Sequence, residues 1–159
     1  MRETWVLVAD SARARLFSLG AGAIRLEEIG DFINAATRMP GHQLEHAPPS
    51  RVHDRFGESR HAIDPRTPPR DKAAAKFASV LGSELERGHA ERRYRDLVLI
   101  APPRFLGVLN GTLGKHLRES VVLEVAKNLT RRSAATIRAE IPLRLSRRGP
   151  LPPPGGHTR

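Results

Sequence analysis

The segment from Thr4 to Ala9 constrains the fold of this chain more than any other part of the sequence. Its residues, Thr-Trp-Val-Leu-Val-Ala, are almost continuously apolar and rich in β-forming types. A strand with one face in water alternates apolar and polar residues, whereas an uninterrupted apolar run is typical of a strand covered on both faces. We therefore expect this segment to be a strand in the interior of a sheet.

Two more strands are expected directly after the first. Residues 10–11, Asp-Ser, are a turn signal, and Arg13 and Arg15 then alternate with apolar residues in a half-exposed strand. The connection is too short for a crossover, so the second strand is predicted to run antiparallel to the first. Ile24 and Leu26 alternate with polar residues in a third strand. The opening of the chain thus predicts a three-stranded meander.

The second half of the chain predicts alternating helices and strands. The expected elements are, in order, a helix over residues 71–88 that ends at Gly88, a strand over 96–101, a helix over 106–117, a short buried strand over 121–125 and a helix capped by Ser133. A meander followed by such units gives the order βββ-αβαβα. We therefore predict a mixed α/β fold, with one mixed sheet and helices packed on it.

Two segments stand apart from this pattern. Residues 38–70 hold six of the thirteen prolines and show no apolar periodicity. A long loop of this kind inside a compact domain is usually functional or disordered. Residues 146–159, rich in Pro, Gly and Arg, cannot form a core and are predicted to be a disordered tail. The expected organisation is one domain over residues 1–145, followed by that tail.

Composition bounds the function. The chain of 159 residues has 27 Lys and Arg against 17 Asp and Glu, a formal charge of +10, which favours RNA, DNA or an acidic surface as a partner. A bias of the proteome toward arginine explains the charge equally well. The absence of cysteine excludes disulfides and Cys-ligated zinc. Apolar runs are too short to span a bilayer or to direct export, so we expect a cytoplasmic protein with no membrane partner.

Cationic side chains in the long loop are the first candidate binding residues. They are Arg51, His53, Arg55, Arg60, His61 and Arg66, followed closely by Arg70. On an extended loop such side chains contact RNA phosphates or stack on bases. The alternative is that Arg–Asp pairs hold the loop on its own domain. Arg104 is a further candidate, because it follows a central strand near the start of a helix, a position attractive to anions.

Three stretches of the sequence together resemble a known family. They are the opening TWVLVADSARARLF of residues 4–17, the loop motifs RVHDRFG at 51–57 and RHAIDPRT at 60–67, and LVLIAPPRFLG at 97–107 with EVAKNLT at 124–130. The family is the bacterial host attachment proteins, named for a requirement in attachment to host cells. The resemblance covers about residues 3–145 and implies a relation to the middle domain of archaeal and eukaryotic peptide release factors. It also implies a ribonuclease-H-like, five-stranded mixed sheet flanked by helices.

The catalytic loop of release factors is missing from this sequence. Peptide release needs a Gly-Gly-Gln loop, and the matching place, residues 57–62, reads Gly-Glu-Ser-Arg-His-Ala. A near match at residues 41–43, Gly-His-Gln, replaces the second glycine and so restricts the backbone freedom that the chemistry requires. We therefore expect no release activity.

Other catalytic and metal chemistries also lack their residues. A two-metal nuclease needs converging carboxylates, and Asp10 has no counterpart after Ile100, where the next strand ends in Ala-Pro. Asp10 is more simply a turn residue. His42 and His46 have the spacing of two ligands on a helix, but the surrounding prolines argue against a helix there. We expect no catalytic residue, no cofactor and no metal.

Two functional interpretations remain. The first is a non-catalytic module that binds RNA or the translation machinery, with the ribosome as a possible partner. The second is a regulatory protein- or small-molecule-interaction domain that affects attachment to host cells indirectly. The sequence favours the first, and an enzyme comes third. The oligomeric state is not determined by the sequence.

Overall fold

The computed structural model describes residues 3–20, 24–38 and 68–143. The predicted tail over 146–159 and most of the long loop, residues 39–67, lie outside the described residues. The same is true of six predicted site residues: Arg51, His53, Arg55, Arg60, His61 and Arg66.

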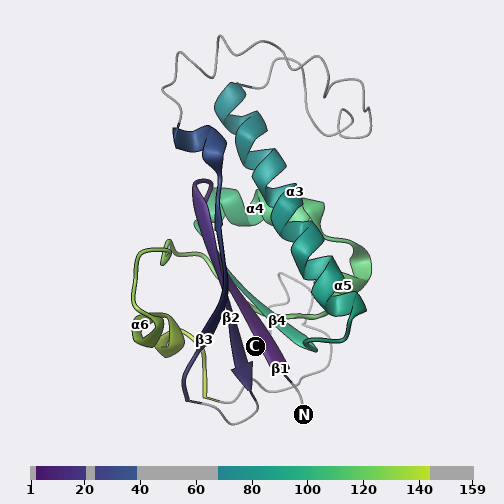
Figure 1. The fold of residues 1–159 in the computed structure, drawn as a ribbon, viewed down its shortest axis with the longest axis vertical. Helices are drawn as coiled ribbons and strands as arrows, with labels where there is room; N and C mark the ends of the chain where they lie inside the picture. Colours follow the sequence, from purple (N-terminus) through teal and green to yellow (C-terminus); the bar gives the residue numbers. More distant parts are fainter. Residues whose placement is uncertain (1–2, 21–23, 39–67, 144–159) are drawn as a thin grey trace, which may run out of the picture.

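A five-stranded mixed sheet forms the centre of the fold, with the strand order β3-β2-β1-β4-β5 (Figure 1). Its strands are β1 (Glu3–Ala9), β2 (Arg13–Gly20), β3 (Glu27–Ile33), β4 (Asp96–Ile100) and β5 (Val121–Val125). The first three are antiparallel neighbours, and β4 pairs parallel with both β1 and β5. The predicted meander and the predicted five-stranded mixed sheet are confirmed. The ribonuclease-H-like character remains a prediction.

Helical segments cover both faces of the sheet. They are η1 (Ala35–Arg38), α3 (Pro69–Ala90), α4 (Pro103–Thr112), α5 (Lys115–Glu119) and α6 (Ala134–Ala139). Helices α3, α4 and α5 pack on one face, and α6 packs on the other (Figure 1). Strand β1 serves both layers, since Trp5 and Leu7 join the first core cluster while Val6 and Val8 join the second. The continuous apolar run is therefore explained by burial on both sides, as predicted.

Helix α3 does not end at Gly88, which corrects the prediction made from the sequence. The helix continues to Ala90, and the chain then turns at Arg92, whose φ of 58° is left-handed. Gly88 is a residue of the helix, and the indole of Trp5 occupies the space that a side chain at this position would need. The glycine thus permits close packing of α3 on β1 and does not act as a helix stop.

The single helix predicted over residues 106–117 is in fact two helices. Leu113 has an extended backbone and Gly114 is the N-cap of α5, so the chain breaks between α4 and α5. Leu113 and Leu117 are both buried, on opposite sides of this break. The spacing of the leucines indicates that they are buried against the same face of the sheet. It does not distinguish one helix from two helices that pack on that face.

The two edge strands also differ from expectation. The third strand begins at Glu27 rather than Ile24, and Ile24 is 75% exposed. In β5, expected to be buried, only Val121 is buried. Each of these strands pairs on one side only, so backbone pairing with its neighbour holds it in place without full burial of its side chains. In the described part of the chain, no helix has the length and apolar character needed to cross a membrane.

Candidate functional site

The carboxyl edge of the parallel strands brings together several chain segments. The β1–β2 turn lies there, and so does the start of α4, which follows β4 after a short connection. The first turn of α3 joins this edge through an ion pair between Asp71 and Arg104 of α4. Figure 1 shows the start of α3, η1 and the β1–β2 turn gathered at the upper end of the sheet. Ligand sites of α/β sheets usually form at this edge.

Asp10 organises the β1–β2 turn. Its Oδ1 accepts hydrogen bonds from the backbone N–H groups of Ala12 at 2.8 Å and Arg13 at 2.9 Å. Its Oδ2 accepts from Asn128 Nδ2 at 3.2 Å and from Thr130 Oγ1 at 3.0 Å. One oxygen therefore closes the turn itself, and the other ties the turn to the segment after β5. The prediction that Asp10 is a turn residue is confirmed.

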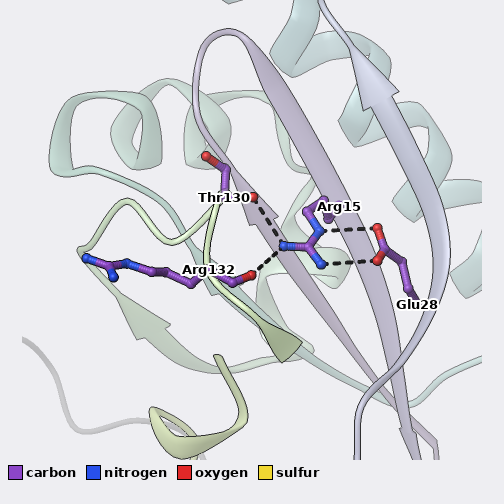
Figure 2. Close-up of polar contacts among 4 residues, drawn as sticks. All are labelled: Arg15, Glu28, Thr130 and Arg132. Atoms are coloured by element: carbon purple, nitrogen blue, oxygen red, sulfur yellow. Dashed lines mark hydrogen bonds and ion pairs between the residues drawn. The ribbon is translucent and has the colours of Figure 1, made fainter. Parts of the chain in front are cut away.

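Arg15 of β2 makes a second connection to the segment after β5. Its Nε and Nη2 donate to the two carboxylate oxygens of Glu28 at 3.2 and 3.1 Å, a bidentate pair. Its Nη1 donates to the backbone carbonyls of Thr130 at 3.2 Å and Arg132 at 2.7 Å. Figure 2 shows the guanidinium between these groups, with the Arg132 side chain extending away. With four acceptors on its three nitrogens, Arg15 serves the fold and is not available to a ligand.

Two of the cationic residues singled out in the sequence, Arg70 and Arg104, are within the described part of the chain, and Arg104 is at the start of α4, as expected. Pro102 is the N-cap and Pro103 the first helical residue, so the proline pair makes a rigid strand-to-helix turn. The Arg104 side chain is 83% exposed, and its Nη2 lies 3.3 and 3.2 Å from the two carboxylate oxygens of Asp71. An ion pair this exposed contributes little stability, so the guanidinium can exchange to a stronger anion.

The first two turns of α3 add three more cationic side chains. Arg70 and Lys76 are exposed and Lys72 is half-buried, and none of them pairs with a carboxylate among the described residues. We name Arg70, Lys72, Lys76 and Arg104 the cationic end of α3. The sequence interpretation singled out Arg70 and Arg104 but missed the two lysines, because they fall on the polar positions of an ordinary helical pattern. The sequence feature that could have identified these lysines is the near absence of acidic residues around them.

At its other end, α3 carries a polar cluster of a different kind. His116 Nε2 lies 3.1 Å from Glu86 Oε1, and Ser120 Oγ lies 3.1 Å from His89 Nε2. A Ser–His pair resembles part of a hydrolytic triad, but no carboxylate orients His89 in the part of the chain described. Among residues 3–20, 24–38 and 68–143, no group of three or more His, Cys, Asp or Glu residues is placed to hold a metal ion.

The fold defines the chain as a mixed α/β domain. At the carboxyl edge of its sheet, Asp10 and Arg15 are held by hydrogen bonds, and the cationic end of α3 is exposed. A family model described as "Protein required for attachment to host cells" matches residues 5–141. The chain therefore belongs to that family, as the resemblance in its sequence indicated.

The solved structures that this chain resembles include a translation termination factor. The crystal structure of an archaeal translation termination factor, aRF1, is similar to this chain with a TM-score of 0.49 and 12% sequence identity. The similarity covers 89% of this chain and 35% of the termination factor, so the chain spans about a third of that protein. No match was found among curated proteins.

Proposed function

We propose that this protein is a non-catalytic module that binds RNA or the RNA-rich translation machinery through phosphate contacts. The observation that carries the proposal is the cationic end of α3, where four basic side chains meet a single acidic one. Phosphate contacts from Lys and Arg supply most of the affinity of such binding and need no fixed base readout.

The position of these charges is unfavourable for the helix itself. The amino end of a helix carries a partial positive charge, so cations there are destabilising by about 0.3–1 kcal/mol each. Arg70 and Lys72 lie in the first turn of α3, and Asp71 is the acidic residue of that turn. An anionic partner at this position would relieve the repulsion. Local sequence choices that work against stability are often found where a protein binds something.

The charge distribution along α3 is uneven, which supports binding at one end. Residues 68–83 together with 103–112 contain four basic residues and one acidic residue. Residues 84–96, which include the far half of α3, contain four arginines and four acidic residues. The net positive charge of this layer is therefore concentrated at the carboxyl edge of the sheet. The six cationic loop residues at 51–66 immediately precede this end in sequence, and we propose that they extend the same surface.

The absence of catalysis is part of the proposal. The sequence contains no Gly-Gly-Gln. Both carboxylate oxygens of Asp10 are engaged in holding the turn. In this view the protein acts in the cytoplasm as a binding partner, and its effect on attachment to host cells is indirect.

Co-sedimentation with purified ribosomes at low and high salt tests the proposal. The full chain is compared with the triple variant Arg70→Gln, Lys72→Gln, Lys76→Gln. A matched control neutralises three exposed cations at the opposite edge of the sheet, Arg95, Lys115 and Arg118, and a second control neutralises Arg147, Arg148 and Arg159 of the tail.

We expect the α3 variant to lose most of its ribosome association while both controls retain it. Equal losses in all three variants would mean that only the overall charge matters. In that event, or if the tail variant alone loses association, the binding is non-specific counterion release and the proposal is wrong.

A further inference from the structure

A second surface, on the opposite face of the sheet from α3, has features of a binding groove. It lies between α6 and the segment that leads into β3, and has a volume of about 700 Å³. Binding sites for small ligands usually have about 300–1,000 Å³. Four large apolar residues line it: Ile24, Leu26, Ile141 and Leu143. Leu26 and Ile141 also belong to the second core cluster, so the apolar floor of the groove continues into the core.

The rim of this groove exposes large apolar side chains to solvent. Ile24 is 75% exposed and Leu143 is 85% exposed, the two highest values among the exposed large hydrophobic residues of the described chain. Two alanines of α6, Ala135 and Ala139, are also exposed and one helical turn apart on the groove wall. Small side chains at this spacing let a second helix approach closely. Contiguous apolar exposure of this kind marks a contact surface.

The charged residues that line the groove are of one sign. They are Arg25 and Arg138, and among the described residues no acidic side chain lines it. The Arg138 guanidinium is held in place, because its Nη1 donates to the carbonyl of Ile141 at 2.7 Å. Arg25 is exposed at the entrance. An apolar floor with an exposed guanidinium at its entrance is complementary to an apolar stripe flanked by carboxylates.

We infer that this groove binds an acidic amphipathic helix of a partner protein. Amphipathic helices bind by laying their apolar face into such grooves, and the flanking charges fix their orientation. A second copy of the chain fits less well, since a symmetric contact would bring two exposed Arg25 side chains together on proteins of charge +10. The inference is independent of the proposed RNA-binding function, because the groove and the cationic end of α3 share no residue.

Fluorescence anisotropy with three labelled model peptides tests the inference. The first is an amphipathic helix with leucines on one face and flanking glutamates. The second replaces the glutamates with lysines, and the third has the composition of the first in scrambled order. We expect the first peptide to bind at least about tenfold more tightly than either of the others.

Matched variants locate the binding site. The double variant Ile24→Ser, Leu143→Ser is expected to weaken binding of the acidic amphipathic peptide about tenfold, whereas Val80→Ser, at a 53% exposed position of α3, leaves it unchanged. Arg25→Glu is expected to weaken it as well, and Lys115→Glu, with the same change of charge at an exposed position outside both surfaces, is not. All five positions are exposed, so the variants should fold.

Four outcomes would overturn the inference. Equal binding of the scrambled peptide would mean that the net charge of the peptide, and not its amphipathic helix, determines the binding. Absence of binding by the acidic peptide, or binding that the groove variants leave unchanged, would remove the groove as the site. A dimer seen by light scattering that Ile24→Ser, Leu143→Ser converts to a monomer would make a second copy the occupant instead.

Discussion

Gly88 of α3 lies directly against the indole of Trp5 in β1. A Cβ added to the glycine would overlap the ring and would also come within 3.2 Å of the ring of Tyr94. Trp5 and Tyr94 stack with ring centroids 4.5 Å apart, and the Tyr94 hydroxyl donates to the carbonyl of Leu85 at 2.7 Å. A glycine in the last turn of this long helix is thus the condition for packing the two aromatic rings against it.

We predict that Gly88→Ala destabilises the protein by roughly 1–3 kcal/mol, because the added methyl group must displace the indole in a packed core. Gly107 of α4 is the matched control, since nothing lies within 4 Å of a Cβ at that position. Gly107→Ala should stabilise the helix by about 0.5–1 kcal/mol. Urea unfolding followed by Trp5 fluorescence measures both. If the two substitutions have the same sign, the close packing is not what requires Gly88.

A second prediction concerns Arg15. Its side chain is 15% exposed, and it connects β2 to Glu28 and to the carbonyls of Thr130 and Arg132. Arg15→Ala should lower the free energy of unfolding by roughly 2 kcal/mol, because these acceptors lose a charged donor. Arg104→Ala, at the exposed ion pair with Asp71, should change it by less than about 0.5 kcal/mol. Denaturant titrations of both variants make the comparison, and similar losses would contradict the role assigned to Arg15.

Tyr94 provides a prediction about alkaline pH. Burial, assisted by the nearby carboxylate of Glu86, raises the pKa of Tyr94 above its ordinary value of 10.0. The folded state holds this proton more tightly than the unfolded state does, so the stabilisation is complete below about pH 10 and falls as the pH rises beyond it. Tyr94→Phe should remove this part of the pH dependence while keeping the stacked ring.

The measurement is the free energy of unfolding of both proteins between about pH 8 and pH 11. Since Tyr94 is the only tyrosine in the chain, its ionisation can also be followed directly by ultraviolet absorbance. Identical pH slopes for the two proteins, or ionisation at an ordinary pKa, would show that the hydroxyl is not buried as described.

A fourth prediction concerns the salt dependence of the proposed RNA binding. Each phosphate contact from the cationic end of α3 should contribute about 0.7 to the slope of log K against log salt concentration for a single-stranded RNA. Neutralising Arg70, Lys72 and Lys76 should therefore reduce the slope by about 2. Filter binding of a labelled single-stranded RNA at several salt concentrations measures it. An unchanged slope would mean that these side chains do not touch phosphates.

Much of this fold follows from local patterns in the sequence. The apolar run at Thr4–Ala9 indicated a strand buried on both faces, and the alternation around Arg13 and Arg15 indicated an antiparallel partner. Ser133 was expected to cap the last helix, and its Oγ accepts a hydrogen bond from the N–H of Thr136 at 3.1 Å. These features are readable because side-chain burial within one strand or helix repeats with the period of that element.

The candidate site could be predicted from the sequence only in part. The position of Arg104 near a helix start was expected, because it follows a central strand. The cationic end of α3 as a group did not follow, because Arg104 joins the first turn of α3, through its ion pair with Asp71, only when α3 packs beside α4. The groove likewise could not be predicted, because Ile24 and Leu143, which line it beside α6, are far apart in the sequence.

The sequence by itself determined which segments are strands and helices and that one sheet is covered on both faces, since these depend on spacing between near neighbours. Only the tertiary structure decided why Gly88 lies inside α3, where the chain breaks between α4 and α5, and what Arg15 binds. Arg15 reaches carbonyls 115 and 117 residues away. Such contacts depend on how distant segments pack together, and no local periodicity records that.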